Sequence, residues 1–267
     1  MYKLFTTNYI ISSKFNKKIV MISDIHYYDK KMSSILNKVV SKIKTIHPSY
    51  ICIPGDIIDE RYICDKEIFI DFLNELSSIS PVIVSIGNHE IKTKTDHESS
   101  YDKKLFKEIR KINNLYLLEN ESIELDEFSF TGLYFKEEAY KENKSSAEEI
   151  RKVIDKYFRN GIKSDKYKIV LSHSPFVLAS VKDSKLYQDS DLILSGHTHA
   201  GITPIIFHKI TKRVFVSPAK HILPKDSYGY LKKHKTIVSS GIIRLSHFNP
   251  FRKFNFLFKG EIVVIDL

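Results

Sequence analysis

The chain is organised around Leu192-Ile193-Leu194-Ser195-Gly196-His197-Thr198-His199-Ala200-Gly201, an apolar run that ends in two histidines flanked by glycines. A short apolar run bounded by turn residues is typical of a buried β-strand. Because glycine lets the backbone bend as it leaves a sheet, the imidazoles of His197 and His199 can face the same point. This arrangement is typical of a metal site. The pair alone is equally consistent with two histidines on one face of a strand.

Four other strand-like runs also end in polar residues that can bind metals. The four runs are Lys18–Ser23, Tyr50–Ile53, Val82–Ile86 and Tyr167–Leu171. The residues that follow them are Asp24 and His26, Asp56, Asn88 and His89, and His173. Between the first three runs, apolar residues recur at the helical period over 32–46 and 65–77, with Asp65 as the predicted N-cap. Strands that alternate with helices predict parallel pairing, with helices on the faces of the sheet.

The remaining predicted elements are less regular. Helices are expected over Tyr101–Ile112 and from Ser146 to Gly161, where Ser146 and Glu149 match a capping box. Short strands are expected at 115–118, 122–125, 128–133, 214–216, 236–238, 242–243 and 262–265. No internal repeat or low-complexity linker divides the sequence. Residues 1–267 are therefore predicted to form a single domain.

Composition indicates a globular protein in a reducing compartment. Hydrophobic residues make up 42% of the 267 residues and charged residues 28%, proportions that exclude intrinsic disorder. Cys52 and Cys64 provide no disulfide framework, and Cys52 lies in an apolar run where a reduced thiol is expected. The segment Met1–Ile11 lacks the pattern of a secretory signal, and no apolar run is long enough to span a membrane. A cytoplasmic location is therefore expected.

The formal net charge of +10 favours anionic partners such as nucleic acid, phosphorylated substrates or an acidic lipid surface. Lysine is abundant along the whole chain, as in proteins from AT-rich genomes, so the charge alone does not identify a partner. The segment 246–259 interleaves five phenylalanines with three basic residues. Its later phenylalanines share one strand face and suit the core. Phe248 and Phe251, beside Arg252 and Lys253, would suit an acyl chain with a phosphate, or contact with the inner face of an anionic membrane.

Eight candidate side chains follow the five strand-like runs, and the carboxyl ends of parallel strands converge on one crevice. They are Asp24, His26, Asp56, Asn88, His89, His173, His197 and His199. Imidazole nitrogens mixed with carboxylate and amide oxygens suit Zn²⁺, Mn²⁺ or Fe rather than Ca²⁺. The set is too large for one zinc ion and suits two metals, which can hold a phosphate and activate a water when they lie about 4 Å apart.

These motifs resemble those of the calcineurin-like metallophosphoesterases. The matching blocks are Asp24-Ile25-His26, Gly55-Asp56-Ile57-Ile58-Asp59, Gly87-Asn88-His89-Glu90, His173 and Gly196-His197-Thr198-His199. The resemblance implies that one metal is bound by Asp24, His26, Asp56 and His199, and the other by Asn88, His173 and His197, with Asp56 bridging the two. It implies that His89 protonates the leaving oxygen or stabilises the transition state. It further implies hydrolysis of a phosphodiester, phosphomonoester or pyrophosphate bond by a hydroxide that bridges two Mn, Fe or Zn ions.

Other stretches resemble a branch of small bacterial phosphoesterases, several of them envelope-associated, that includes enzymes acting on UDP-diacylglucosamine. These stretches are 117–121, 130–133, 171–175, 196–201 and 238–241. The likeness covers most of the chain and implies a four-layer α/β/β/α sandwich of two mixed β-sheets flanked by helices. It also implies a phosphorylated small-molecule or lipid-linked substrate.

Three positions depart from family patterns. Glu60 and Arg61 follow Asp59, where protein Ser/Thr phosphatases have Asp-Arg-Gly after the Gly-Asp pair, and this argues against a protein phosphatase. Leu133-Tyr134-Phe135 follow Gly132, where the branch tends to have an acid. Ala200 follows His199, where some members from Gram-negative bacteria carry arginine.

Two other functions stay open at this stage: a nucleic-acid-binding protein or nuclease of the same fold, and a scaffold that has lost catalysis. Structural zinc sites are closed by four ligands and are rarely built from Asn and Asp, and no expected ligand is missing here. A metal-dependent hydrolase is therefore the leading prediction. Asp59 and Glu90 either orient a metal ligand or cap a helix. Tyr228 and Tyr230 fall in a predicted loop that either overlooks the site or packs in the core. The histidines outside the motifs are predicted at the surface: His47, His97, His208, His221, His234 and His247.

Overall fold

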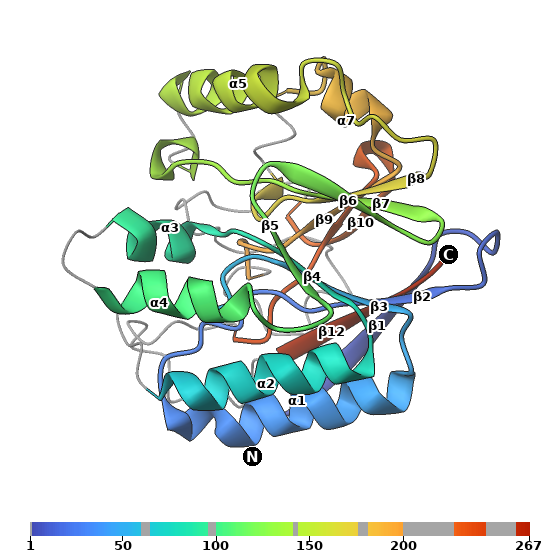
Figure 1. Ribbon diagram of the computed structural model, residues 1–267. Helices are drawn as coiled ribbons and strands as arrows, with labels where there is room; N and C mark the ends of the chain where they lie inside the picture. The colour runs from blue at the N-terminus through green and yellow to red at the C-terminus, as the bar shows by residue number, and fades with distance from the viewer. Residues whose placement is uncertain are drawn as a thin grey trace.

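Two six-stranded β-sheets stacked face to face form the centre of the protein, with helices on their outer faces (Figure 1). This architecture comes from a computed structural model that describes residues 2–59, 65–95, 100–140, 144–175, 181–199, 227–243 and 260–267. The segments 214–216 and 246–259, for which strands and a Phe-rich hairpin are predicted, lie outside the described residues.

The first sheet has the strand order β1-β12-β2-β3-β4-β5. Its strands are β1 (Leu4–Ile10), β12 (Gly260–Asp266), β2 (Lys18–Met21), β3 (Tyr50–Pro54), β4 (Val82–Ser85) and β5 (Leu115–Leu118). The strands β2 to β5 pair in parallel, as the alternation of strands and helices predicts. β12 pairs parallel with β1 and antiparallel with β2, so the last strand of the chain lies between its first two.

The second sheet has the strand order β10-β11-β9-β8-β7-β6. Its strands are β6 (Glu121–Leu125), β7 (Phe128–Gly132), β8 (Tyr167–Leu171), β9 (Leu192–Ser195), β10 (Gly229–Leu231) and β11 (Thr236–Val238). The central strands pair in parallel, whereas the edge strands β6 and β10 are antiparallel to their neighbours. Both sheets are therefore mixed.

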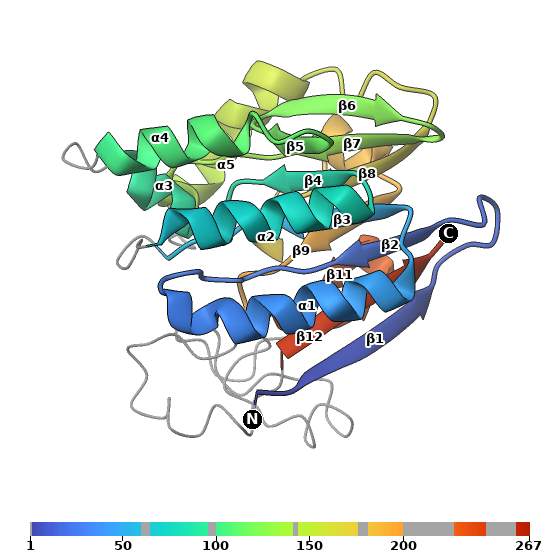
Figure 2. The ribbon, with the colours of Figure 1, turned by 60° about the horizontal axis from the view of Figure 1, so that its bottom comes forward.

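Helices cover the outer face of each sheet (Figure 2). The longer helices are α1 (Ser33–Ile46), α2 (Lys66–Ile79), α4 (Ser100–Ile109) and α5 (Lys144–Phe158). The shorter ones are α3 (Asn88–Thr95), α7 (Lys185–Asp189), and the 3₁₀ turns η1 (Lys30–Met32), η2 (Glu137–Tyr140) and η3 (Lys232–His234). α1, α2 and α4 pack on the first sheet, and α5 and α7 on the second. Among the described helices, none combines the length and the apolar character that crossing a bilayer requires.

Three apolar layers separate the four layers of secondary structure, and the alternation of side chains along each strand explains them. In β3, Ile51 and Ile53 pack against the helices, whereas Cys52 packs against the second sheet. In β8, Leu171 faces the first sheet and Val170 faces α5 and α7. The predicted α/β/β/α sandwich is therefore confirmed.

Asp65 is the N-cap residue of α2, as predicted, but it has a φ of 53° and makes no capping hydrogen bond through its side chain. Other local predictions are wrong. α5 begins at Lys144, so Ser146 lies inside the helix rather than at its N-cap. Residues 242–243 pair with the loop after β2 but form no strand. Tyr230 lies in β10 instead of a loop.

Candidate metal centre

The predicted ligand residues follow five central strands, and the structure brings them together at one end of the two sheets. Asp24 and His26 follow β2, Asp56 follows β3, Asn88 begins α3 after β4, His173 follows β8, and His197 and His199 follow β9. Hydrogen bonds join the two sheets here. His197 N–H donates to Asp24 Oδ1 over 3.0 Å, and His173 Nδ1 donates to the carbonyl of Pro54 over 2.8 Å. The predicted convergence of the strand ends is confirmed.

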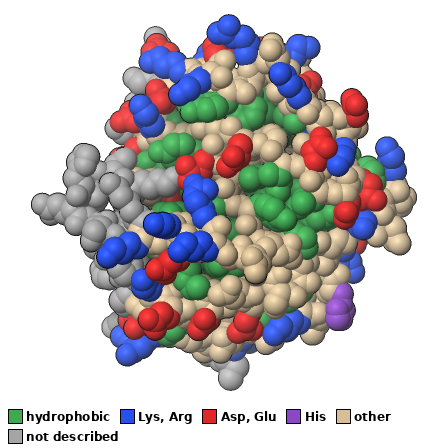
Figure 3. Space-filling view, viewed as in Figure 1, with side chains coloured by type: hydrophobic (Ala, Val, Ile, Leu, Met, Phe, Trp, Pro, Cys, Tyr) green, Lys and Arg blue, Asp and Glu red, His purple; other side chains and the backbone are tan. Residues whose placement is uncertain are grey.

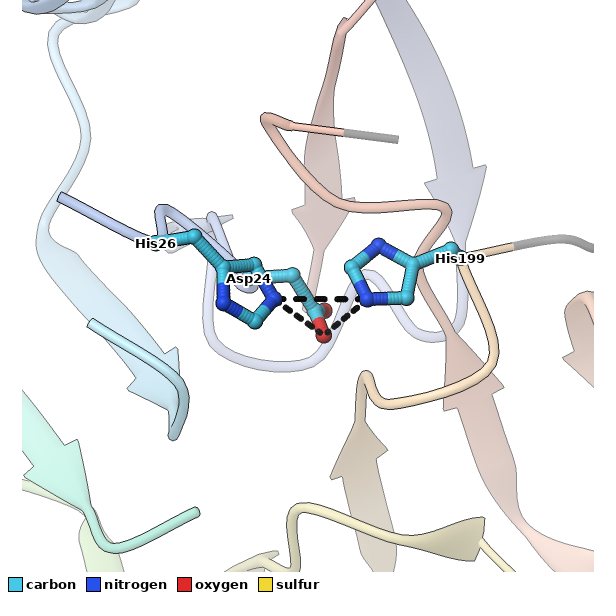
Figure 4. Close-up of side chains that lie close together, drawn as sticks. All are labelled: Asp24, His26 and His199. Atoms are coloured by element: carbon cyan, nitrogen blue, oxygen red, sulfur yellow. Dashed lines mark hydrogen bonds and ion pairs between the residues drawn. The ribbon is translucent and has the colours of Figure 1, made fainter. Parts of the chain in front are cut away.

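Asp24, His26 and His199 form one cluster and point toward one another (Figure 4). The Nε2 atom of His199 lies 3.6 Å from Asp24 Oδ1 and 3.3 Å from His26 Nε2. The Nε2 atom of His26 lies 4.0 Å from the same Asp24 oxygen. A carboxylate and two imidazoles thus converge within the reach of a single cation.

Asp56, His173 and His197 form a second cluster. The Oδ2 atom of Asp56 lies 3.0 Å from His173 Nε2, and the rings of His173 and His197 have centroids 5.0 Å apart. The same oxygen of Asp56 lies 3.7 Å from His26 Nε2, a residue of the first cluster. Asp56 therefore lies between the two clusters.

Asn88 and His89 open α3 at the edge of these clusters. Among the described residues, Asn88 Oδ1 is a buried atom with no hydrogen-bond partner. A buried amide oxygen without a partner is costly, so its presence here fits a ligand of a divalent cation. His89 is 15% exposed, and its Nε2 lies 3.9 Å from Asp56 Oδ2. The donor set, made of imidazole nitrogens and carboxylate and amide oxygens, fits Zn²⁺, Mn²⁺ or Fe.

Five of these residues have left-handed backbone conformations, which are uncommon outside glycine. Their φ values are 50° for Asp24, 46° for His26, 51° for Asp56, 68° for His197 and 50° for His199. Each such conformation costs on the order of 1 kcal/mol or more and is concentrated at functional sites. The folded loops therefore hold these five residues in backbone conformations that their own local preferences do not favour.

Two glycines let neighbouring loops approach the carboxylates closely. A Cβ atom at Gly196 would overlap Asp24 Oδ2, and one at Gly87 would overlap Asp56 Oδ1. In place of side chains, backbone groups contact these oxygens: His89 N–H donates to Asp56 Oδ1 over 3.0 Å. Asp56 Oδ2 is left facing the histidines.

Glu90 is fully buried and holds two of the site loops together. Its Oε2 accepts hydrogen bonds from the backbone N–H groups of Asp56 and Gly87, at 2.9 and 2.7 Å. Its Oε1 accepts one from Ile58 at 3.1 Å. Burial, and then the charge of Asp56, raise the pKa of Glu90 to about 7, against the effect of these donors. Its bonds to Asp56 and Ile58 support the predicted role of orienting a ligand-bearing loop, and its bond to Gly87, the residue before α3, supports the predicted role of a helix cap.

The histidines differ in their protonation when no cation is bound. Burial lowers the pKa of His173, but the carboxylate of Asp56 outweighs burial and raises it to about 9. Burial and the neighbouring charge of His173 lower the pKa of His197 to about 3. Burial and His89 likewise hold the pKa of His26 well below its usual range. His26 and His197 are therefore neutral, as ligation requires, whereas His173 must lose a proton to bind a metal.

A sequence profile of the calcineurin-like phosphoesterases matches residues 17–201, which include every residue of both clusters. The chain belongs to this family. Members are metal-dependent phosphoesterases, which agrees with the clustered His and Asp ligands. The predicted superfamily, one of metal-dependent phosphoesterases, is thus confirmed.

Three relatives are similar to this chain in sequence. An uncharacterised metallophosphoesterase of Campylobacter jejuni is 30% identical over 227 residues, covering 84% of this chain and 53% of that protein. One of Helicobacter pylori is 29% identical over 184 residues, covering 69% and 45%. The DNA double-strand break repair protein Mre11 of Nanoarchaeum equitans is 32% identical over 134 residues, covering 44% and 34%.

The chain spans about half the length of the bacterial relatives it matches. Those relatives are metallophosphoesterases without an assigned substrate. The comparisons therefore support the superfamily and do not support the narrower likeness to enzymes that act on UDP-diacylglucosamine.

Other predicted residues lie outside the clusters. The hydroxyl of Tyr228 donates a hydrogen bond to Glu261 over 2.8 Å, which supports the predicted packing role of Tyr228. His47 is exposed, as predicted, whereas His234 is partly buried beside Tyr187. His97, His208, His221 and His247 lie outside the described residues.

Sequence reasoning did not single out two residues that contact the clusters. The ring of Tyr140, at the end of η2, lies 5.6 Å from that of His197 and 6.2 Å from that of His173. Gly241 packs against Asp24, where a Cβ atom would come within 2.7 Å of the Asp24 Cβ. Both contacts join segments far apart in the sequence, and neither residue carries a motif for metal binding.

Proposed function

We propose that the chain hydrolyses a phosphoester or pyrophosphate bond at a dinuclear metal centre. In this proposal Asp24, His26, Asp56 and His199 hold one cation, and Asn88, His173 and His197, together with Asp56, hold the other. The observation that carries the proposal is that one carboxylate oxygen, Asp56 Oδ2, faces His173 Nε2 at 3.0 Å and His26 Nε2 at 3.7 Å. A shared carboxylate of this kind suits two neighbouring cations.

Two divalent cations, when bound, supply Lewis acidity to the phosphoryl group and to the attacking water. The chain orients the ligands for them. His173 uses its Nδ1 hydrogen on the Pro54 carbonyl, which fixes the tautomer and directs Nε2 toward Asp56. Asp24 is held by the backbone N–H of His197, and Asp56 by that of His89.

His89 is proposed to donate a proton to the leaving oxygen or to stabilise the transition state. Its ring meets that of His26 edge-on at 4.5 Å, and its side chain is more exposed than that of His26. A substrate that enters from solvent would therefore meet His89, and the similarly exposed His199, before the buried His26. Because His89 also lies within reach of the atoms of His26 and Asp56, a ligand role is the competing assignment.

The proposal is tested with chromogenic phosphomonoesters and phosphodiesters, hydrolysed by the full chain after chelation and reloading with Mn²⁺. We expect hydrolysis to depend on added metal and to fall to background in His197→Ala. Glu75→Ala, at an exposed residue of α2, is the control and should keep full activity. Equal activity in chelated and reloaded protein would contradict the proposal.

A nuclease is the second candidate function, because one relative is a DNA repair protein and the formal charge is +10. On the face in Figure 3, however, basic and acidic side chains are interspersed instead of forming one basic surface. Cleavage of single- and double-stranded oligonucleotides with Mn²⁺ tests this candidate. A nuclease should bind DNA with an affinity that falls steeply as salt is raised.

We also propose a lipid-linked substrate and peripheral membrane contact. Both proposals rest on the sequence of a segment outside the described residues, which contains Phe248, Phe251, Arg252 and Lys253. Binding of the parent chain to anionic liposomes, and its loss in a Phe248→Ser and Phe251→Ser double variant, would support them.

A further inference from the structure

We propose that Tyr140 contacts the substrate, donating its hydroxyl hydrogen to a phosphoryl oxygen on the His173 and His197 side of the site. This inference rests on the proposed function and adds a substrate-binding residue to it.

The ring of Tyr140 lies across both imidazoles of the second cluster. Its plane is inclined by 53° to that of His197 and by 54° to that of His173. Tyr140 is also partly exposed, unlike the buried His173. Tyr140 thus borders the second cluster and keeps partial contact with solvent.

The segment that leads to Tyr140 is held at two points before this residue. Ala139 is buried among Ile150 and Ile154 of α5, in the outer apolar layer of the second sheet. Nearer the strand β7, the Asn120 side chain accepts a hydrogen bond from Tyr134 N–H and donates one to the Tyr134 carbonyl, both at 2.9 Å. A side chain whose segment is held by packing and by hydrogen bonds is positioned before the substrate binds, which limits the entropy lost on binding.

Within the part of the chain that the structure describes, no hydrogen bond occupies the hydroxyl of Tyr140, whereas the hydroxyls of Tyr27, Tyr50 and Tyr228 donate to Asp65, Asp126 and Glu261. Tyrosine hydroxyls that are largely buried usually have a partner. A neutral phenol is a hydrogen-bond donor suited to a phosphoryl oxygen, and it adds no charge that would compete with the cations.

The ring alone could act by supporting the imidazoles, so the test separates the hydroxyl from the ring. Tyr140→Phe keeps the ring and removes the hydroxyl. Tyr187→Phe, which removes a hydroxyl beside His234 on α7, is the matched control. The full chain loaded with Mn²⁺ is assayed for metal content, for binding of inorganic phosphate by calorimetry, and for hydrolysis of a chromogenic diester.

We expect Tyr140→Phe to weaken phosphate binding and to lower kcat/KM, each by roughly 10-fold or more, because a hydrogen bond to a charged group is lost. Metal content should equal that of the parent, and Tyr187→Phe should match the parent throughout. Unchanged phosphate affinity and kcat/KM in an active, metal-loaded Tyr140→Phe would overturn the inference alone. Loss of metal in Tyr140→Phe would also overturn it, because the hydroxyl would then support the ligands. A parent chain without bound metal or hydrolysis would contradict the proposed function itself.

Discussion

The buried carboxylate of Glu90 accepts a hydrogen bond of 2.9 Å from the backbone N–H of Asp56. Glu90 lies in α3 and Asp56 lies in the loop after β3, so this contact joins the ends of two neighbouring strands. Further bonds from Gly87 and Ile58 to the same carboxylate complete the connection. The position of the carboxylate that lies between the two clusters is therefore set by a residue that belongs to neither.

Replacing Glu90 should weaken the metal centre without removing a ligand. In Glu90→Gln, the amide cannot accept all three hydrogen bonds on its two terminal atoms, so at least one buried N–H loses its acceptor. We expect metal affinity to fall by roughly 10- to 100-fold and the free energy of unfolding to fall by about 1–3 kcal/mol. Metal titration and thermal unfolding measure the two effects, with the exposed Glu75→Gln as the control. Unchanged metal affinity in Glu90→Gln would show that the loops hold their geometry without it.

His89→Gln should lower turnover by roughly 10²- to 10⁴-fold, because a general acid or a transition-state contact is removed. Metal content should survive, since the proposed role of His89 is toward the substrate. Steady-state kinetics and elemental analysis of the same preparation test both statements. Metal loss in this variant would instead make His89 a ligand.

Metal binding should release a proton from His173. Its pKa of about 9 in the metal-free chain keeps it protonated at pH 7.5, and ligation requires the neutral imidazole. Because folding raises the pKa of His173, its pairing with Asp56 stabilises the metal-free fold at pH values below the ordinary histidine pKa. This stabilisation is lost as the pH rises through about 9. Calorimetric titration in buffers of different ionisation enthalpy counts the protons. We expect about one proton at pH 7.5 and a metal affinity that rises with pH up to about 9. Metal uptake without proton release at pH 7.5 would mean that His173 is neutral in the metal-free chain.

Glu261 in β12 should support the fold and, through it, the site. It is fully buried and accepts hydrogen bonds from Thr7 Oγ1 at 2.5 Å, Tyr228 OH at 2.8 Å and Ser240 N–H at 2.6 Å. Glu261→Ala leaves these donors unpaired, at about 1–3 kcal/mol for each buried group. We expect the melting temperature to fall by roughly 2–4 °C for each kcal/mol lost. Since Ser240 leads into the Gly241 contact with Asp24, metal affinity should fall as well. A melting temperature equal to that of the parent would contradict this role.

The parts of the fold that the sequence predicts are those with local patterns. Continuous apolar runs predict β2, β3 and β4, and the helical period of apolar residues predicts α1 and α2. α3 is not predicted, because its eight residues begin with polar site residues and hold a single aliphatic side chain, Ile91. The capping motif at Ser146 fails because α5 already begins at Lys144.

In the candidate site, too, the residues marked by a local pattern are predictable and the others are not. The eight clustered or adjacent residues are predictable because each follows a strand, and parallel strands end at one edge. The hydrogen bonds of Glu90 and the ring contacts of Tyr140 depend on segments that meet only in the folded chain. No local pattern marks them, so the sequence leaves Glu90 with two open roles and does not single out Tyr140.

The metal content of the parent chain and of Asp56→Ala tests the central claim most directly. The carboxylate of Asp56 faces histidines of both clusters, so one substitution should affect both metal positions. Elemental analysis after loading with Mn²⁺ should give two ions in the active parent chain and a marked loss at both positions in Asp56→Ala, while Glu75→Ala keeps two. One ion or none in the active parent, or two ions in Asp56→Ala, would contradict a dinuclear centre built on Asp56.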